Sequence, residues 1–201
     1  MDVKVLDDIH RYWFGDLSAP DQPVGEERVQ RWFRPTEAID AHIRDTWGGY
    51  FDEAGAANWD LPWLTREQQL GLIILLDQFP RQIWRASGEA FAYDAAALAI
   101  ARQLTADGGW RRFWPVEQTF LFLPFEHSEN LADQDRALLL FAAAACEAPA
   151  ALVEWCRGGQ DFATKHRDII RKFGRFPHRN AMLGRESTPE EVEFLKGGRG
   201  F

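Results

Sequence analysis

The segment that most constrains the fold is Leu70–Phe79, "LGLIILLDQF", which is apolar on nearly every side. A helix of this kind has to be surrounded by other elements, because it has no face suited to water. Thr65 and Gln68 precede it with the spacing of a capping box, which predicts that a helix begins there. The sequence therefore predicts a central helix that is buried all round. Pro80 is expected to mark its end, because the residue before a proline avoids helical geometry.

Helical spacing continues through the rest of the chain. Leu6, Ile9 and Trp13 recur at three or four residues near the start, and Thr188 and Glu191 form a second capping box near the end. No segment alternates apolar and polar residues as a half-buried strand does, and no internal repeat of fixed period is found. We expect an all-α fold, a single domain over residues 1–201, with about eight or nine helices.

Composition excludes several classes of protein. The net charge of -8 and the pI near 5.2 argue against binding to nucleic acid or to an anionic membrane, because phosphate backbones require a basic face. No apolar run approaches the roughly 20 residues that span a bilayer, and no signal peptide is recognised. Cys146 and Cys156 lack metal-ligand spacing and are expected to be reduced thiols. We expect a soluble, cytoplasmic protein, and no motif identifies a cofactor or a metal.

The first of three unusual polar stretches is "LLDQFPRQIWR", residues 75–85. Asp77 and Gln78 lie at the end of the buried helix, and Arg81 and Arg85 follow within two turns. A buried carboxylate is costly unless it is paired. Asp77 is therefore either the partner of one of these arginines in a structural ion pair, or a catalytic carboxylate.

The second stretch is "LPFEHSEN", residues 123–130. Pro124 is expected to kink or break the helix before it, and Asn130 to cap the next one. Glu126, His127 and Glu129 lie between them. These groups suit acid–base chemistry or a hard cation, but carboxylates also stabilise the beginning of a following helix.

The third stretch runs from residue 165 to residue 180, "KHRDIIRKFGRFPHRN". Up to position 179 it holds six Lys or Arg residues and one acid, within a chain whose net charge is -8. His166 lies on the apolar face of the predicted helix, either as a core histidine or as a functional one. Gly174 has the position of a left-handed helix exit. The other polar residues of this stretch that we consider for ligand binding are Arg167, Arg171, Arg175, His178, Arg179 and Asn180.

These three stretches carry a family resemblance. "LLDQFPRQIWR", "LPFEHSENLADQ" and "HRDIIRKFGRFPHRNAMLGRESTPEE", with "WFRP" upstream, closely resemble the bacterial family known as domain of unknown function 924. The resemblance extends from about Val5 to Phe194. It implies an all-α architecture of the TPR-like type, a right-handed stack of antiparallel-paired helices without sequence repeats, and it implies no activity.

Three hypotheses for the function follow. In the first, the polar stretches meet at one pocket that binds a small carboxylate or phosphate through charge-assisted hydrogen bonds. The residues assigned to binding are Gln78, Arg81, Arg85, Glu129, Arg167, Arg171, Arg175, His178, Arg179 and Asn180.

In the second hypothesis the protein is an acid–base hydrolase or lyase that uses Asp77, Glu126 or His127, with His166 as a further candidate. A metal-assisted form of this reaction, with ligands from Glu126, His127, Glu129 or His166, is weaker because metal-ligand spacing is missing. In the third hypothesis a TPR-like body binds a peptide or protein, by analogy of fold alone. The sequence does not predict the oligomeric state.

Overall fold

Helices account for all the regular secondary structure in residues 1–15 and 17–198, which are the residues that the computed structural model describes. The α segments are α1 (Lys4–Phe14), α2 (Glu26–Phe33), α3 (Glu37–Trp47), α4 (Phe51–Ala56), α5 (Arg66–Ile73), α6 (Phe79–Ile83), α7 (Asp94–Thr105), α8 (Pro115–Glu126), α9 (Leu131–Glu147), α10 (Val153–Phe173) and α11 (Pro189–Lys196). A 3-10 turn joins α3 to α4 and a π turn joins α5 to α6, so these eleven described segments form nine helices. The all-α prediction is confirmed.

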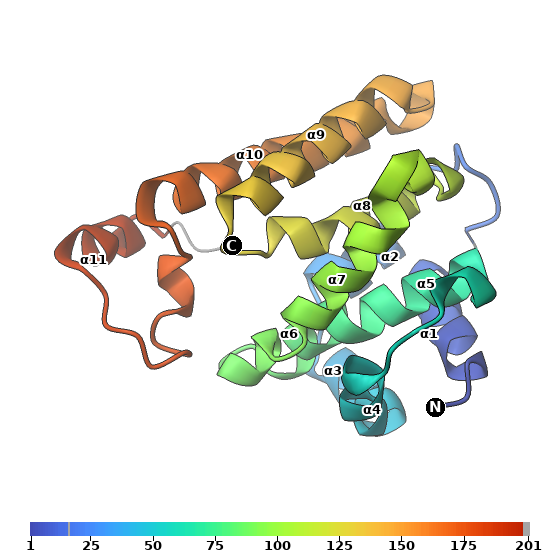
Figure 1. Cartoon of the computed structure of the whole chain (residues 1–201), viewed down its shortest axis with the longest axis horizontal. Helices are drawn as coiled ribbons and strands as arrows, with labels where there is room; N and C mark the ends of the chain where they lie inside the picture. The colour runs from blue at the N-terminus through green and yellow to red at the C-terminus, as the bar shows by residue number, and fades with distance from the viewer. Residues whose placement is uncertain (16, 199–201) are drawn as a thin grey trace.

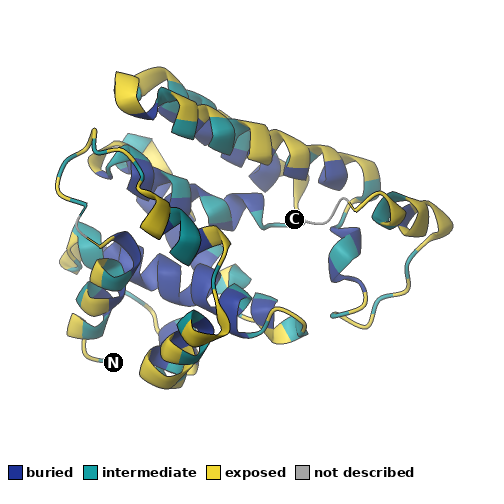
Figure 2. Cartoon of the chain, turned by 180° about the vertical axis from the view of Figure 1, so that it is seen from behind, coloured by how far each residue is buried: buried dark blue, intermediate teal, exposed yellow. Residues whose placement is uncertain are grey.

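The core surrounds the continuous helix formed by α5, the π turn and α6. Leu70, Leu72 and the whole run from residue 73 to residue 76 are fully buried there. The Thr65 capping box is present, and α1, α7 and α8 pack around this helix while α9 and α10 lie side by side along one edge of the molecule (Figure 1). In Figure 2 the buried residues, in dark blue, lie along this central helix and on the inward-facing sides of the helices around it. The predicted central helix is confirmed.

Gly71 explains how α1 approaches α5 so closely. A Cβ atom at this position would lie 2.2 Å from the backbone oxygen of Leu6. Because backbone atoms cannot rotate away as a side chain can, only glycine allows the two helices to reach this separation. The contact places the apolar face of α1 directly on the central helix.

The expectation that Pro80 ends the helix is wrong. The helix continues to Ile83, and Pro80 lies in the first turn of α6, directly after a π turn over Ile74–Gln78. A proline in a helix lacks an N–H donor, and its ring clashes with the carbonyl group four residues earlier. The longer hydrogen-bond span of a π turn changes that register, which accommodates the proline. Asp77 lies within this turn.

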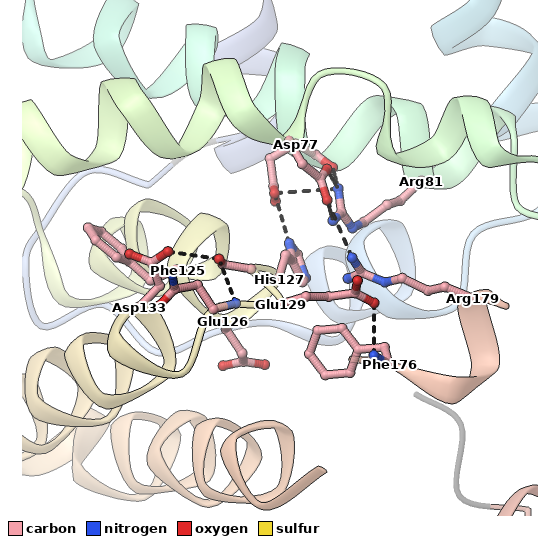
Figure 3. Close-up of polar contacts among 12 residues, drawn as sticks. Asp77, Arg81, Phe125, Glu126, His127, Glu129, Asp133, Phe176 and Arg179 are labelled. Carbon is pink, nitrogen blue, oxygen red and sulfur yellow. Dashed lines mark hydrogen bonds and ion pairs between the residues drawn. The ribbon is translucent and has the colours of Figure 1, made fainter. Parts of the chain in front are cut away.

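A second proline also lies inside a helix. Pro124 does not break α8, which continues to Glu126, with His127 at its C-cap. Asn130 caps α9 as expected, through a hydrogen bond of 2.8 Å from the backbone N–H of Ala132. The loop between α8 and α9 is therefore only four residues long, from 127 to 130. It presents its polar groups toward the central helix and the C-terminal part of the chain (Figure 3).

The C-terminal part begins at Gly174, whose φ of 70° gives the left-handed helix exit that the sequence predicts. A short turn over Pro177–Arg179, a loop and α11 follow, at one end of the α9–α10 pair (Figure 1). The capping box of Thr188 and Glu191 is present at the start of α11. The TPR-like arrangement that the resemblance implies is not confirmed. No helix in the described residues is long and apolar enough to cross a membrane.

Candidate functional site

The site is built on a contact between Asp77 and His127. Asp77 is completely buried, and its Oδ1 lies 2.8 Å from Nδ1 of His127. Burial alone would raise the pKa of Asp77, but His127 and Arg81 outweigh it and lower the pKa to about 2. Burial, reinforced by Arg81, lowers the pKa of His127 to about 4. At neutral pH the pair is therefore an ionised carboxylate beside a neutral imidazole.

The second carboxylate oxygen of Asp77 accepts a hydrogen bond from the side chain of Gln78. Arg81 donates to the backbone oxygen of Asp77 at 2.7 Å and lies 3.4 Å from Oδ1. Its two terminal nitrogens also donate to both carboxylate oxygens of Asp94, each at 2.8 Å. Arg81 is thus fully engaged in a two-pronged ion pair. Its structural role in fixing Asp77 matches one of the two interpretations of this stretch.

Arg179 reaches the same region from the C-terminal turn (Figure 3). Its side chain is only 7% exposed, and its guanidinium carbon Cζ lies 4.5 Å from the ring centroids of both Phe91 and Phe176. Its closest carboxylate oxygen, in Asp94, lies 3.6 Å away, which is beyond a hydrogen bond. Nε is buried without a partner, and the guanidinium donates no hydrogen bond to any residue that the structure describes.

The electrostatic surroundings of Arg179 are unfavourable. Burial and the neighbouring Arg81 lower the pKa of Arg179 to about 10, although Asp94 and Glu129 act in the opposite direction. Since a guanidinium stays charged at neutral pH, the folded chain carries this cation at a net cost. An anion bound at this position would remove that cost.

Two more histidines lie close by. The ring of Phe176 lies 5.6 Å from that of His166 and 5.5 Å from that of His178. Nδ1 of His178 is buried without a partner among the described residues, and burial together with Arg179 lowers the pKa of His178 to about 4. Nδ1 of His166 lies 3.0 Å from Oε1 of Glu126, whose other oxygen is buried and unpaired in the described structure. Glu126 and His166 therefore form a second carboxylate–histidine pair.

A group of ion pairs holds the C-terminal turn in place. Glu129 accepts hydrogen bonds from the backbone N–H of Phe176 at 2.8 Å and from both terminal nitrogens of Arg185 at 2.6 and 2.9 Å. Arg175 forms a similar pair with Glu191, to which the side chain of Asn180 also donates at 3.3 Å. These contacts fix the position of Arg179, and they give Glu129, Arg175 and Asn180 structural partners.

Three arginines that we considered for ligand binding lie apart from this cluster. Arg85 pairs with Asp40 at 2.6 Å, and Arg171 pairs with Asp168 at 3.1 Å on an exposed part of α10. Arg167 pairs with Asp135 of α9. Their role in binding stays a prediction without support from this geometry. The residues brought together are Asp77, Gln78, Arg81, Glu126, His127, Glu129, His166, His178 and Arg179.

Phe91, Asp94 and Phe176 belong to the site but were not identified from the sequence. An acidic residue in the first turn of a helix is ordinary, so nothing in the sequence indicated that Asp94 of α7 also lies within ion-pair distance of Arg81 and Arg179. The two phenylalanines had no feature to separate them from core residues.

A hollow of about 240 Å³ lies elsewhere, lined by residues that include Pro115, Gln118 and Glu147, and none of the cluster residues lines it. In the described part of the chain, no group of three or more His, Cys, Asp or Glu side chains is arranged to hold a metal ion.

Comparisons with known proteins identify the family. The sequence profile described as "Bacterial protein of unknown function (DUF924)" matches residues 9–199. The chain is similar to the solved structure of ATU0120, a protein of unknown function from Agrobacterium tumefaciens, at 30% identity and a TM-score of 0.79. That match covers 98% of this chain and 99% of the other. No curated protein matches the sequence. The chain therefore belongs to the DUF924 family of bacterial proteins of unknown function.

Proposed function

We propose that the cluster binds a small anion that carries a carboxylate or phosphate group, with Arg179 as its principal anchor. The observation that supports this proposal is a guanidinium that is only 7% exposed and donates no hydrogen bond to the described residues. Buried charged groups are ordinarily paired and hydrogen-bonded. A ligand oxygen is the partner that this guanidinium lacks.

The surroundings of Arg179 suit such a ligand. The guanidinium carbon lies 4.5 Å from the ring centroids of Phe91 and Phe176, and the N–H donors of a guanidinium form the fork that carboxylate and phosphate accept. Arg81 adds positive charge but is already saturated by Asp94. The neutral His127 and His178 can accept or donate a hydrogen bond without adding a fixed charge.

The same contacts limit the size of the ligand. Within the cluster, Arg81 is bound to Asp94 and only Arg179 lacks a hydrogen bond to the described residues. Arg85, Arg167 and Arg171 have carboxylate partners elsewhere. One anionic group rather than a polyanion therefore fits the site. A cytoplasmic location, expected from the sequence, is part of this proposal. A peptide-binding function rests only on analogy of fold.

A thermal-shift titration with inorganic phosphate and with succinate tests the proposal, at constant ionic strength set by chloride. At ten times its Kd a ligand stabilises the folded state by about 1.4 kcal/mol. For a chain of 201 residues this is a rise in Tm of roughly 3–6 °C.

Arg179→Lys keeps the charge but removes the fork, and it should abolish the saturable rise. Arg171→Lys is the matched control, because Arg171 is exposed and paired only with the nearby Asp168. Equal responses of the two variants to both anions, or no saturable response of the wild type, would reject the site.

A further inference from the structure

We infer that His127 is a general base that activates water to hydrolyse an ester bond in an anion held by Arg179, with Asp77 as its positioning residue. The substrate class is a carboxylic ester that carries a separate acidic group. This inference rests on the proposed anion site and adds a reaction to it.

The hydrogen bond between Asp77 and His127 determines which imidazole nitrogen can act. An ionised carboxylate only accepts hydrogen bonds, so Nδ1 of His127, 2.8 Å from Oδ1, must carry the proton. The lone pair is then on Nε2. In the described residues Nε2 has no hydrogen-bond partner, and the side chain is 14% exposed, so water can reach it.

Asp77 is held firmly enough to orient the ring. It lies in the π turn of the central helix with no exposed surface, and Gln78 and Arg81 occupy positions around its carboxylate. A carboxylate fixed in this way sets the tautomer and stabilises the imidazolium that forms during proton transfer. Asp77 does not itself need to contact the substrate.

The charges around the pair keep the base unprotonated and can stabilise a developing oxyanion. Burial and Arg81 keep His127 neutral at pH 7, which leaves the base in its active form. The guanidinium of Arg179 lies in the same region as the carboxylate of Asp77, whose negative charge acts to raise the pKa of Arg179 (Figure 3). Arg179 can therefore hold the acidic group of the substrate while the positive field of the two arginines stabilises the oxyanion.

The imidazole of His127 carries one proton from water to the leaving group. Nε2 of His127 takes a proton from water, and the water oxygen bonds to the acyl carbon. The bond from the acyl carbon to the alcohol oxygen then breaks. The imidazolium returns the proton to the leaving alkoxide, or to solvent when the leaving group is a stable phenolate. The products are a carboxylic acid and an alcohol, and no other reactant is required.

The test compares two activated esters, mono-4-nitrophenyl succinate, which is anionic, and 4-nitrophenyl acetate, which is neutral. General-base catalysis contributes about 10²–10⁴-fold to rate. His127→Gln keeps a donor for Asp77, and it should lower kcat/KM for the anionic ester at least about 100-fold. The exposed His42→Gln is the matched control and should hydrolyse both esters at the wild-type rate.

The pH profile separates His127 from an ordinary histidine. A base with a pKa of about 4 keeps roughly nine-tenths of its active form at pH 5, whereas one with the usual pKa keeps about 3%. The wild-type kcat/KM should therefore remain nearly constant down to pH 5. Asp77→Asn should lower kcat/KM while phosphate still stabilises the protein, because Asn does not fix the tautomer.

A measurement on the wild type covers the case in which His127→Gln does not fold. Diethyl pyrocarbonate acylates unprotonated imidazole, so His127 should still be modified at pH 5, and phosphate should slow that modification. Equal hydrolysis by wild type and His127→Gln with intact phosphate binding, or an unreactive His127 at pH 5, overturns the inference. Absence of phosphate binding in the wild type would instead reject the anion site beneath it.

Discussion

Arg179→Met replaces the buried cation with an apolar chain of similar length, and we expect it to stabilise the protein in the absence of ligand. In the wild type the guanidinium carbon lies 4.5 Å from the ring centroids of both Phe91 and Phe176, and the guanidinium donates no hydrogen bond to the described residues. Methionine fits such a slot and makes favourable contacts with aromatic rings. Asp94 retains its two-pronged partner Arg81, so the substitution leaves no buried charge unpaired.

The magnitude follows from the pKa of Arg179, which burial and Arg81 lower to about 10. A fall from the ordinary value of 12.5 to about 10 corresponds to a cost on the order of 3 kcal/mol for the charged form. The cost applies fully at pH 7, since the group is then charged in both the folded and the unfolded chain. Loss of the two ring contacts offsets about 1 kcal/mol. The net expectation is a gain of about 2 kcal/mol, or roughly 4–8 °C in Tm for a chain of this length.

Urea denaturation at pH 7 in chloride buffer measures this change, and Arg171→Met is the control at an exposed position, expected to stay within about 0.5 kcal/mol of the wild type. Addition of phosphate should narrow or reverse the difference, because only the wild type is stabilised by it. If Arg179→Met is instead less stable than the wild type by more than about 1 kcal/mol, Arg179 is a satisfied structural residue, and the reasoning behind the anion site fails.

Three further predictions concern the framework around the site. Gly71→Ala should lower the free energy of unfolding by more than about 2 kcal/mol, because the added Cβ would lie 2.2 Å from the backbone oxygen of Leu6. The control is Gly158→Ala in α10, where the added Cβ meets open space; in the same urea titration it should raise the free energy of unfolding by about 0.5–1 kcal/mol. Acid should destabilise the fold between about pH 6.5 and 4, because the folded state keeps His127 and His178 neutral while the unfolded state protonates them; His127 contributes up to about 3 kcal/mol. His127→Gln should make this part of the pH–stability curve less steep, and an unchanged slope would contradict the assignment. Glu129→Gln should loosen the C-terminal segment and so speed amide hydrogen exchange over residues 175–188, while exchange in the central helix stays at the wild-type rate. An equal change of exchange rate throughout the protein would show that this carboxylate does not hold the segment.

Local signals in the sequence were sufficient for most of the helices. Capping boxes and left-handed glycines depend on a few neighbouring residues, so Thr65, Gly174 and Thr188 identified helix ends that the structure confirms. Pro80 misled because its effect depends on the hydrogen-bond register of the preceding turn. A π turn has no recognisable sequence pattern within an apolar run, so the continuation of the helix past Pro80 could not be predicted.

The site was predicted only in part, for a related reason. Asp77 was identified because a carboxylate at the end of a fully apolar helix requires a partner, with an arginine expected in that role. His127 was identified only as one of the polar groups of residues 123–130, and the structure pairs it with Asp77. The run of basic residues gave a correct local charge but not its distribution in space. Arg167 and Arg171 meet acids on exposed helix surfaces, whereas Arg179 enters the interior after the chain turns at Gly174. Counting charges along the sequence does not distinguish these environments.

The most direct test of the central claim follows the Nε–H group of Arg179 by ¹H–¹⁵N NMR during a phosphate titration, with the Arg171 resonance as an internal reference. The account predicts a saturable shift and slower solvent exchange for Arg179 Nε–H, because phosphate supplies the acceptor that the described residues do not, while Arg171 stays unchanged. An Arg179 signal that stays constant, or that moves only in parallel with Arg171, would contradict the account.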